Sequence, residues 1–321
     1  MASPNSNYTD LITTTLEFMG DEIADGVSAN NAATAWMKAN DGWGTIEGGE
    51  KITEPLAYAS NTNGGWYSGA EKFPVAPQEE FTASEYAWKQ IAVPIVSTGL
   101  ETDVQNVGKA RRFDLAKERI KNARRTAANI VATGMFSDGT GSGGKQLTGL
   151  LALASATPTT GTYGGINRAT ASNAFWRNKF TDTGADPSST TILGLMNTMW
   201  YSLVRGSDKP KLLIGDSNVA GAYEAALQAN QRFTDPKMAE LGFENLKYKS
   251  AVFVMDGNCT TKGLYFLNTD FMRVRIAANR NFKALPTRTA FDQDAEVIVL
   301  AAALNLTCSN AILQGRMEFA A

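Results

Sequence analysis

The chain has 321 residues, of which 43% are hydrophobic and 19% charged, and its formal net charge at pH 7 is −2. It is long enough for one large core or two ordinary ones, and its composition is that of a folded soluble protein. The sequence contains no His, which excludes Ser-His, Cys-His and His-metal sites.

Segments that would direct the chain into or across a membrane are not evident. No run of eighteen apolar residues is present, and Met1–Thr9 lacks the basic and apolar regions of a signal peptide. We therefore expect no membrane association and folding in a cytoplasm. Cys259 and Cys308 are isolated, so we expect two ordinary buried thiols and no disulfide framework.

The first 45 residues are predicted to form an acidic arm. Residues 1–37 contain five acidic side chains and no Lys or Arg, and Ile12, Leu16, Met19 and Ile23 mark a short amphipathic helix. A second short helix is predicted from Ala32 to Lys38. Such an arm buries too little apolar surface to fold alone. We expect it to dock on a basic surface of the same or a neighbouring copy, the alternative being an ordinary frayed terminus.

Residues 46–101 carry signals of extended chain. Strand signals lie at 51–59, 65–73 and 86–96, separated by turn clusters, and they predict a long hairpin followed by a strand that Pro94 confines to an edge or a bulge. The hairpin carries aromatic residues but no evident core, so we expect a partner to cover it. These aromatic residues are Trp66, Tyr67, Phe73 and Phe81.

Residues 109–135 predict a long helix lying flat on a sheet. Its apolar stripe has spacings of three and four and consists of Phe113, Ala116, Ile120, Ala123, Ala127, Ile130 and Gly134. The remaining surface has eight basic and two acidic residues, a local charge of +6. The basic residues are Lys109, Arg111, Arg112, Lys117, Arg119, Lys121, Arg124 and Arg125. This face is either an ordinary solvated surface or one that faces a polyanion.

A Gly-rich stretch follows the helix, and Gly139–Lys145 fits the phosphate-loop spacing G-x-x-x-x-G-K. Gln146 stands where a Ser or Thr should bind Mg²⁺, and the stretch follows a helix instead of a strand. A flexible joint between domains is therefore the favoured interpretation, with a nucleotide-binding enzyme as the alternative.

Residues 150–255 alternate helix and strand signals. Helices are predicted at 192–203 and from about residue 216, and strands at 211–214 and 250–255. These signals indicate an α/β module.

The Thr-, Gly- and Ser-rich residues 157–189 are expected to form long surface loops, and residues 256–321 are expected to be mostly strand, with a tight turn at Ser309-Asn310. Asp292, Asp294 and Glu296 alternate on one strand, which favours an exposed polar face over a cation site.

The order of these parts resembles the major capsid proteins of tailed bacteriophages and prophages, which have the HK97 fold. The resemblance covers essentially the whole chain. The stretches that carry it are 137–150 (Ser-Asp-Gly-Thr-Gly-Ser-Gly-Gly-Lys-Gln-Leu-Thr-Gly-Leu), 157–170 and Phe175-Trp-Arg-Asn178.

The resemblance implies an α+β HK97-like fold in five parts. These are an N-terminal arm (1–45), an extended E-loop (46–81), a peripheral domain (82–149) with a spine helix (109–135), an axial domain (150–255) and return strands to both domains (256–321). It also implies a shell of pentamers and hexamers, assembled in the host bacterial cytoplasm and enclosing double-stranded DNA.

Specific residues receive roles from this resemblance. Trp66, Tyr67 and Phe73 would contact neighbouring subunits, and the basic helix would face the packaged genome through Arg111, Arg112, Lys117, Lys121, Arg124 and Arg125. A portal and a separate scaffolding protein are expected partners, and no catalytic, cofactor or metal site is expected. The isopeptide crosslink of some members is not assigned to Lys51 or Lys72, because no local pattern marks either residue.

The alternatives are an encapsulin-like compartment, which shares the fold, and, from another class, the phosphate-loop enzyme. A soluble DNA-binding protein is disfavoured by the acidic overall balance.

Overall fold

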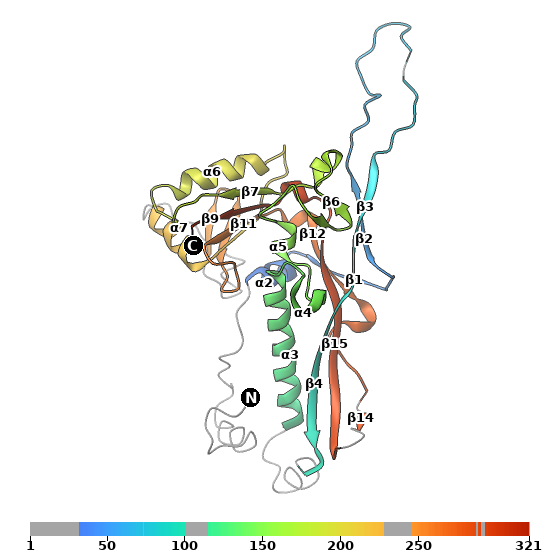
Figure 1. The fold of residues 1–321 in the computed structure, drawn as a ribbon, viewed down its shortest axis with the longest axis vertical. Coiled ribbons are helices and arrows are strands. Elements are labelled where there is room, and N and C mark those ends of the chain that lie inside the picture. The colour runs from blue at the N-terminus through green and yellow to red at the C-terminus, as the bar shows by residue number, and fades with distance from the viewer. Residues whose placement is uncertain are drawn as a thin grey trace.

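A computed structural model describes residues 32–72, 74–100, 115–227, 245–286, 288–289 and 293–320. These residues form two six-stranded sheets, a projecting hairpin and a long helix (Figure 1). Within these ranges, no helix is long and apolar enough to cross a membrane.

The first sheet is built around the long strand β15 (Ala295–Cys308). On one side β15 pairs along ten residues with β4 (Lys89–Thr98), in antiparallel register from Ala295 opposite Thr98 to Leu304 opposite Lys89. It also pairs with β12 (Met272–Ala277), β13 (Lys283–Ala284) and β14 (Arg288–Thr289), and β1 (Trp43–Ile46) extends the sheet beyond β12. Among the strands that the structure describes, β4 pairs with β15 alone, so Pro94 lies in an edge strand as predicted.

Helix α3 (Leu115–Met135) lies flat against β4 and β15 (Figure 1). Ala123 and Ala127 are buried against Ile95 and Leu300, and the small alanine side chains allow the helix to approach the sheet closely. The predicted helix on a sheet is therefore confirmed where the structure describes it.

The second sheet has the order β7-β16-β11-β8-β10-β9. Its strands are β7 (Lys179–Asp182), β8 (Leu212–Gly215), β9 (Asn245–Tyr248), β10 (Ala251–Met255), β11 (Gly263–Leu267) and β16 (Gly315–Glu318). Alternate residues of β8 enter two different cores, since Leu213 packs with helices α6 (Ile192–Leu203) and α7 (Ser217–Ala226), whereas Ile214 packs toward the rest of the molecule. Both faces are covered, which explains why these strands are continuously apolar.

The stretch expected to form surface loops is instead partly a compact, buried unit. Residues 157–189 contain a short hairpin of β5 (Thr162–Tyr163) and β6 (Ile166–Asn167), the 3₁₀ helix η4 (Ala171–Trp176) and β7. Tyr163, Arg168 and Trp176 are buried. Arg168 donates to the carbonyls of Ala152, Leu153 and Trp176, so the guanidinium satisfies backbone groups that a loop would leave to water.

Three further expectations are corrected, which concern residues 65–73, the turn at Ser309-Asn310 and, in the next paragraph, Ile130. Among the described residues of 65–73 there is no strand. The turn at Ser309-Asn310 does not form a hairpin: η8 (Ala311–Leu313) follows it, and β16 then joins the second sheet.

Ile130 of the predicted stripe is 44% exposed, whereas Val131 and Ala132 are buried. The buried face shifts because the end of α3 also contacts α2 (Ala32–Ala39), so more than one side of the helix is covered there.

The contact between α3 and the sheet can be tested with two adjacent alanines. Ala127→Asp would bury an unpaired carboxylate at a site that is 1% exposed and should destabilise the fold by about 3 kcal/mol or more. Ala128→Asp, on the exposed face, should change stability by about 0.5 kcal/mol or less. Urea unfolding followed by Trp fluorescence measures both, and equal stability of the two variants would contradict the assigned face.

Candidate assembly surfaces

A long hairpin projects from the body of the molecule (Figure 1). Its paired strands are β2 (Ile52–Ala57) and β3 (Phe81–Tyr86), in register from Ile52 opposite Tyr86 to Ala57 opposite Phe81. Beyond them the two sides are joined by side-chain bonds, including Gln78 Nε2 to Thr62 Oγ1 at 2.6 Å and Asn63 Nδ2 to the Ala76 carbonyl at 2.7 Å. Beyond β2 and β3 the hairpin is thus held together by polar contacts and not by a core of its own.

The exposed apolar side chains of this hairpin form a candidate surface for a partner. Trp66, Tyr67, Val75 and Phe81 are among the most exposed large hydrophobic residues of the described chain. Phe73, which the sequence also assigned to this surface, lies outside the described residues. Large apolar residues gathered on one projection are typical of a surface that another protein covers.

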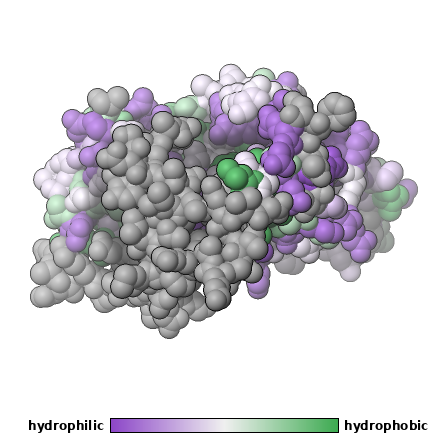
Figure 2. Space-filling view, turned by 90° about the horizontal axis from the view of Figure 1, so that it is seen from below, coloured by the Kyte–Doolittle hydropathy of each residue, from purple (hydrophilic) through white to green (hydrophobic). Residues whose placement is uncertain are grey.

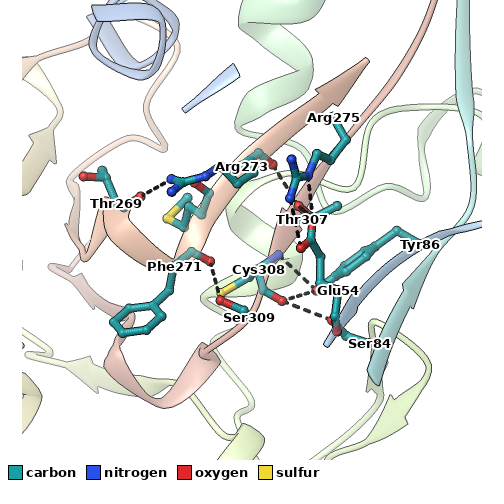
Figure 3. Close-up of polar contacts among 11 residues, drawn as sticks. Glu54, Ser84, Tyr86, Thr269, Phe271, Arg273, Arg275, Thr307, Cys308 and Ser309 are labelled. Carbon is teal, nitrogen blue, oxygen red and sulfur yellow. Dashed lines mark hydrogen bonds and ion pairs between the residues drawn. The ribbon is translucent and has the colours of Figure 1, made fainter. Parts of the chain in front are cut away.

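A bidentate ion pair fixes the base of the hairpin to the first sheet (Figure 3). Arg275 of β12 donates to both carboxylate oxygens of Glu54, at 2.6 and 3.1 Å, and Thr307 Oγ1 donates to the same carboxylate at 3.0 Å. The pair is largely shielded, with side-chain exposures of 27% for Arg275 and 12% for Glu54. The ion pair raises the pKa of the Arg275 guanidinium, which therefore stays charged.

A second anchor joins β3 to the end of β15 (Figure 3). The Tyr86 hydroxyl donates to the Cys308 carbonyl at 2.9 Å and accepts from the Cys308 N–H at 3.2 Å, and Ser84 Oγ donates to the same carbonyl at 3.2 Å. Both side chains are buried. Burial also raises the pKa of the Cys308 thiol to about 12, so this Cys is a neutral packing residue and not a nucleophile.

Residues 162–176, which we call the socket, pack against β3. The Glu85 N–H donates to the Gly164 carbonyl at 2.9 Å, and the Tyr86 and Tyr163 rings meet edge to face at 5.5 Å. Gly164 has φ +55°, and a Cβ there would lie 2.9 Å from the Tyr86 hydroxyl. Glycine is therefore required for both the turn and the close approach.

Sequence reasoning missed these anchors. Glu54, Arg275 and Thr307 are distant in sequence, so no local spacing connects them. A signal for the socket was present in the Gly164-Gly165 pair beside Tyr163 within a polar stretch, since such a pair permits the close approach of another chain segment.

A small open cleft lies beside the ion pair. It has a volume of about 210 Å³ and is lined by Glu54, Asp270, Arg273, Thr307 and Ser309, among others. Arg273 donates to the Thr269 and Met272 carbonyls, which orients its side chain along the cleft wall (Figure 3).

The predicted basic surface lies only partly within the described residues. Lys121 is exposed on the side of α3 opposite Ala123 and Ala127, Arg124 is exposed on the flank of the helix, and Arg125 is half-buried. Arg111, Arg112 and the side chain of Lys117 lie outside the described residues. Arg119 differs from the expectation, because its guanidinium donates to the Val96 carbonyl at 2.8 Å and so points toward β4.

Viewed from the end at which the described part of α3 begins, most of the coloured surface is hydrophilic or neutral, and hydrophobic residues form only small areas (Figure 2).

The Gly-rich stretch is held at its ends and does not present a phosphate site. It follows α3, and Gly141–Gly144 (α4) contains positive φ angles at Ser142, Gly143 and Gly144, so it does not begin a continuous helix. The Thr148 N–H donates to Asn305 Oδ1 at 3.0 Å, and Asn305 is buried in β15. Within the described parts of the chain, no cluster of three or more His, Cys, Asp or Glu residues is arranged to hold a metal ion.

The sequence matches no family model and no curated protein. Solved structures are similar along nearly the whole chain. The capsid asymmetric unit of cyanophage A-1(L) has a TM-score of 0.71 at 18% identity, with 93% of this chain and 95% of that chain covered. The capsid of the native GTA particle has a TM-score of 0.60 at 13% identity, covering 98% and 99%. The holo-SrpI encapsulin complex from Synechococcus elongatus PCC 7942 has a TM-score of 0.54 at 7% identity, covering 99% and 96%.

The architecture is therefore that of proteins that build capsid shells. The chain has the α+β, HK97-like capsid fold, as its sequence predicts.

The ion pair at the hairpin base can be tested by a matched comparison. Glu54→Ala leaves the half-buried Arg275 unpaired and should destabilise the protein by about 1 to 3 kcal/mol. Glu85→Ala removes the exposed pair with Lys51, whose side chains are 47% and 53% exposed, and should cost about 0 to 1 kcal/mol. Thermal unfolding gives both values, and hydrogen exchange of the β2 and β3 amides reports the hairpin directly. An unchanged exchange rate in Glu54→Ala would show that the Glu54–Arg275 ion pair does not hold the hairpin in place.

Proposed function

We propose that this chain is the major capsid protein of a tailed bacteriophage, which self-assembles into an icosahedral shell around double-stranded DNA. The observation that supports this most is the anchored hairpin, which presents exposed aromatic side chains far from the body of its own chain. The capsids of a cyanophage and of the GTA particle share the fold, which supports a shell-forming role. In this proposal the chemistry is association, and many modest contacts between copies add through multivalency.

The parts of the fold take the following roles in the proposal. Residues 46–81 are the E-loop that reaches over a neighbour, residues 82–149 form the peripheral domain with α3 as the spine, and residues 150–255 form the axial domain near the centres of pentamers and hexamers. Residues 1–45 form the arm, and residues 256–321 return to both domains. Trp66, Tyr67 and Phe73 are assigned to the contacts between subunits.

We assign the basic face of α3 to the packaged genome. Arg111, Arg112, Lys117, Lys121, Arg124 and Arg125 carry this role. The support is the local charge of +6 within a chain of net charge −2, together with the exposure of Lys121 and Arg124. A portal and a scaffolding protein complete the proposed partners.

An encapsulin-like compartment is the second candidate, because an encapsulin shares the fold over 99% of this chain. The basic helix favours a nucleic-acid content, since a row of cations lowers the energy of a phosphate backbone more than that of a protein cargo of mixed charge. A phosphate-loop enzyme is not supported by the loop geometry, because Gly139–Lys145 follows a helix.

The assembly role of the hairpin can be tested on the purified full chain. Negative-stain microscopy and size-exclusion chromatography should show particles or discrete rings for the unchanged protein. The double variant Trp66→Ser, Tyr67→Ser should remain folded, because both side chains are exposed, but should lose assembly. The variant Trp66→Phe, Tyr67→Phe keeps the apolar area and should retain it. A wild-type chain that stays monomeric at high concentration would contradict the proposed function.

The genome-facing role can be tested separately. Lys121→Glu with Arg124→Glu changes the surface charge by four units per subunit and should reduce the fraction of DNA-filled particles, because each copy would then repel phosphate. Lys121→Arg with Arg124→Lys keeps the charge and serves as the control. Particles made in the infected host and counted by microscopy as filled or empty give the measurement. Normal filling of the glutamate variant would rule out this role for the two residues.

A further inference from the structure

A groove lies at the end of α3, between this helix, the edge strand β4 and the Gly-rich stretch. Figure 1 shows these three elements beside one another. It has a volume of about 350 Å³ and a mainly apolar lining. Ile91, Ile130, Leu147 and Leu304 line its apolar part, and Lys89 and Lys145 lie in its wall. None of the roles assigned above uses this groove.

Ile130 is the unusual residue in this groove. It lies on the apolar stripe that the sequence predicts for α3, yet its side chain is 44% exposed. The neighbouring odd-numbered residues of β4 face α3, as shown by the buried Ile95 and its contacts with Ala123 and Ala127. The stripe of α3 and the inner face of β4 therefore diverge at Ile130, which leaves apolar surface uncovered.

The charges around the groove are positive. Lys145 is exposed, and Lys89 Nζ donates to the Gly144 carbonyl, which fixes the Gly-rich wall beside β4. An occupant that suits the groove has an apolar face for Ile91 and Ile130 and carboxylates for the ammonium groups.

The N-terminal part of the chain enters the described structure close to this groove. The Ala33 N–H, in the first turn of α2, donates to Asp256 Oδ2 at 3.2 Å. Asp256 Oδ1 accepts from the Asn258 N–H at 3.0 Å, and Thr133 Oγ1 bonds to Asn258 Oδ1 at 3.4 Å. Thr133 is three residues from Ile130 on α3, on the adjacent side of the helix. This series of hydrogen bonds thus connects the start of α2 to Thr133, which is about one helical turn from Ile130 in the groove.

We propose that the groove is the docking site of residues 10–25 of the same chain. This segment has the matching chemistry: Ile12, Leu16, Met19 and Ile23 share one side of a helical period, and the segment is acidic without Lys or Arg. The nine residues from Ile23 to Ala32 span up to about 30 Å when extended, enough to reach the groove from α2. The short tether gives a high effective concentration, which favours the same chain over a second copy.

Engineered disulfides test the site and the identity of the occupant together. The two native cysteines, Cys259 and Cys308, are buried, so introduced pairs dominate the reaction. The full chain with Met19→Cys and Ile130→Cys should form an intrachain disulfide under mild oxidation, detected by a mobility shift on a non-reducing gel and by peptide mass. Met19→Cys with Ala128→Cys is the control, because Ala128 is exposed on the opposite side of α3. A crosslink between two chains, equal crosslinking in the control, or no crosslink would each overturn the proposal.

Proteolysis provides a second measurement on the chain without introduced cysteines. A glutamate-specific protease should cut slowly after Glu17 and Glu22 when the segment is docked. Ile130→Asp places a carboxylate in the apolar groove and should increase the cleavage rate about tenfold, since a buried isoleucine contact is lost. Ala128→Asp should leave the rate unchanged. The assay is carried out on the unassembled fraction from size-exclusion chromatography, so its result does not depend on whether the protein forms shells. Equal rates in all three proteins would overturn the docking site.

Discussion

The position of the hairpin depends on the last two residues of β15. Thr307 bonds to the carboxylate that Arg275 also holds, and the backbone of Cys308 exchanges two hydrogen bonds with the Tyr86 hydroxyl. The chain then passes through η8 into the second sheet. One strand end therefore connects both sheets with the hairpin. The hairpin has no core of its own, so its direction is determined by these contacts and by the packing of Ile52 and Leu56 at its base into the main core.

The two anchors act on different strands of the hairpin and in different physical ways. The ion pair holds β2 and gains strength from its partial burial, although it carries the desolvation cost of two charges. The tyrosine and the socket hold β3 through neutral hydrogen bonds and aromatic packing, with Gly164 allowing the close approach. A change in ionic strength acts mainly on the ion pair, so the base of the hairpin does not rest on electrostatics alone.

The helices and strands whose sequence signals are local could be predicted from the sequence. Helix α6 ends before Gly206, and the apolar runs at β8 and β10 are buried on both faces, so periodicity and length identify them correctly. The sequence did not predict the structure of segments whose conformation depends on tertiary contacts. Trp176 lies in a polar stretch for which the sequence predicts a loop, but its ring is stacked against that of Tyr163.

Some features of the candidate surfaces could likewise be predicted from the sequence, and others could not. The aromatic residues of the hairpin and the charge of α3 could be recognised from sequence, because an arm without a core and a local excess of cations are visible in composition. The outward direction of Lys121 and the inward direction of Arg119 could not be recognised from sequence, since both residues fit the same basic pattern. Arg119 points inward because its guanidinium donates to the Val96 carbonyl, whereas Lys121 is exposed.

Charge is unevenly distributed along this nearly neutral chain, and this distribution bears on how copies would meet in the proposed shell. Residues 47–85 contain seven Glu and two Lys, a net charge of −5, whereas residues 109–135 carry +6. Two hairpins of like charge repel each other, so association through a pair of hairpins is disfavoured. Contacts that place a hairpin on a different part of the next copy do not carry this penalty. Such heterologous contacts generate rings when the rotation between copies closes, which is the geometry that a shell of pentamers and hexamers requires.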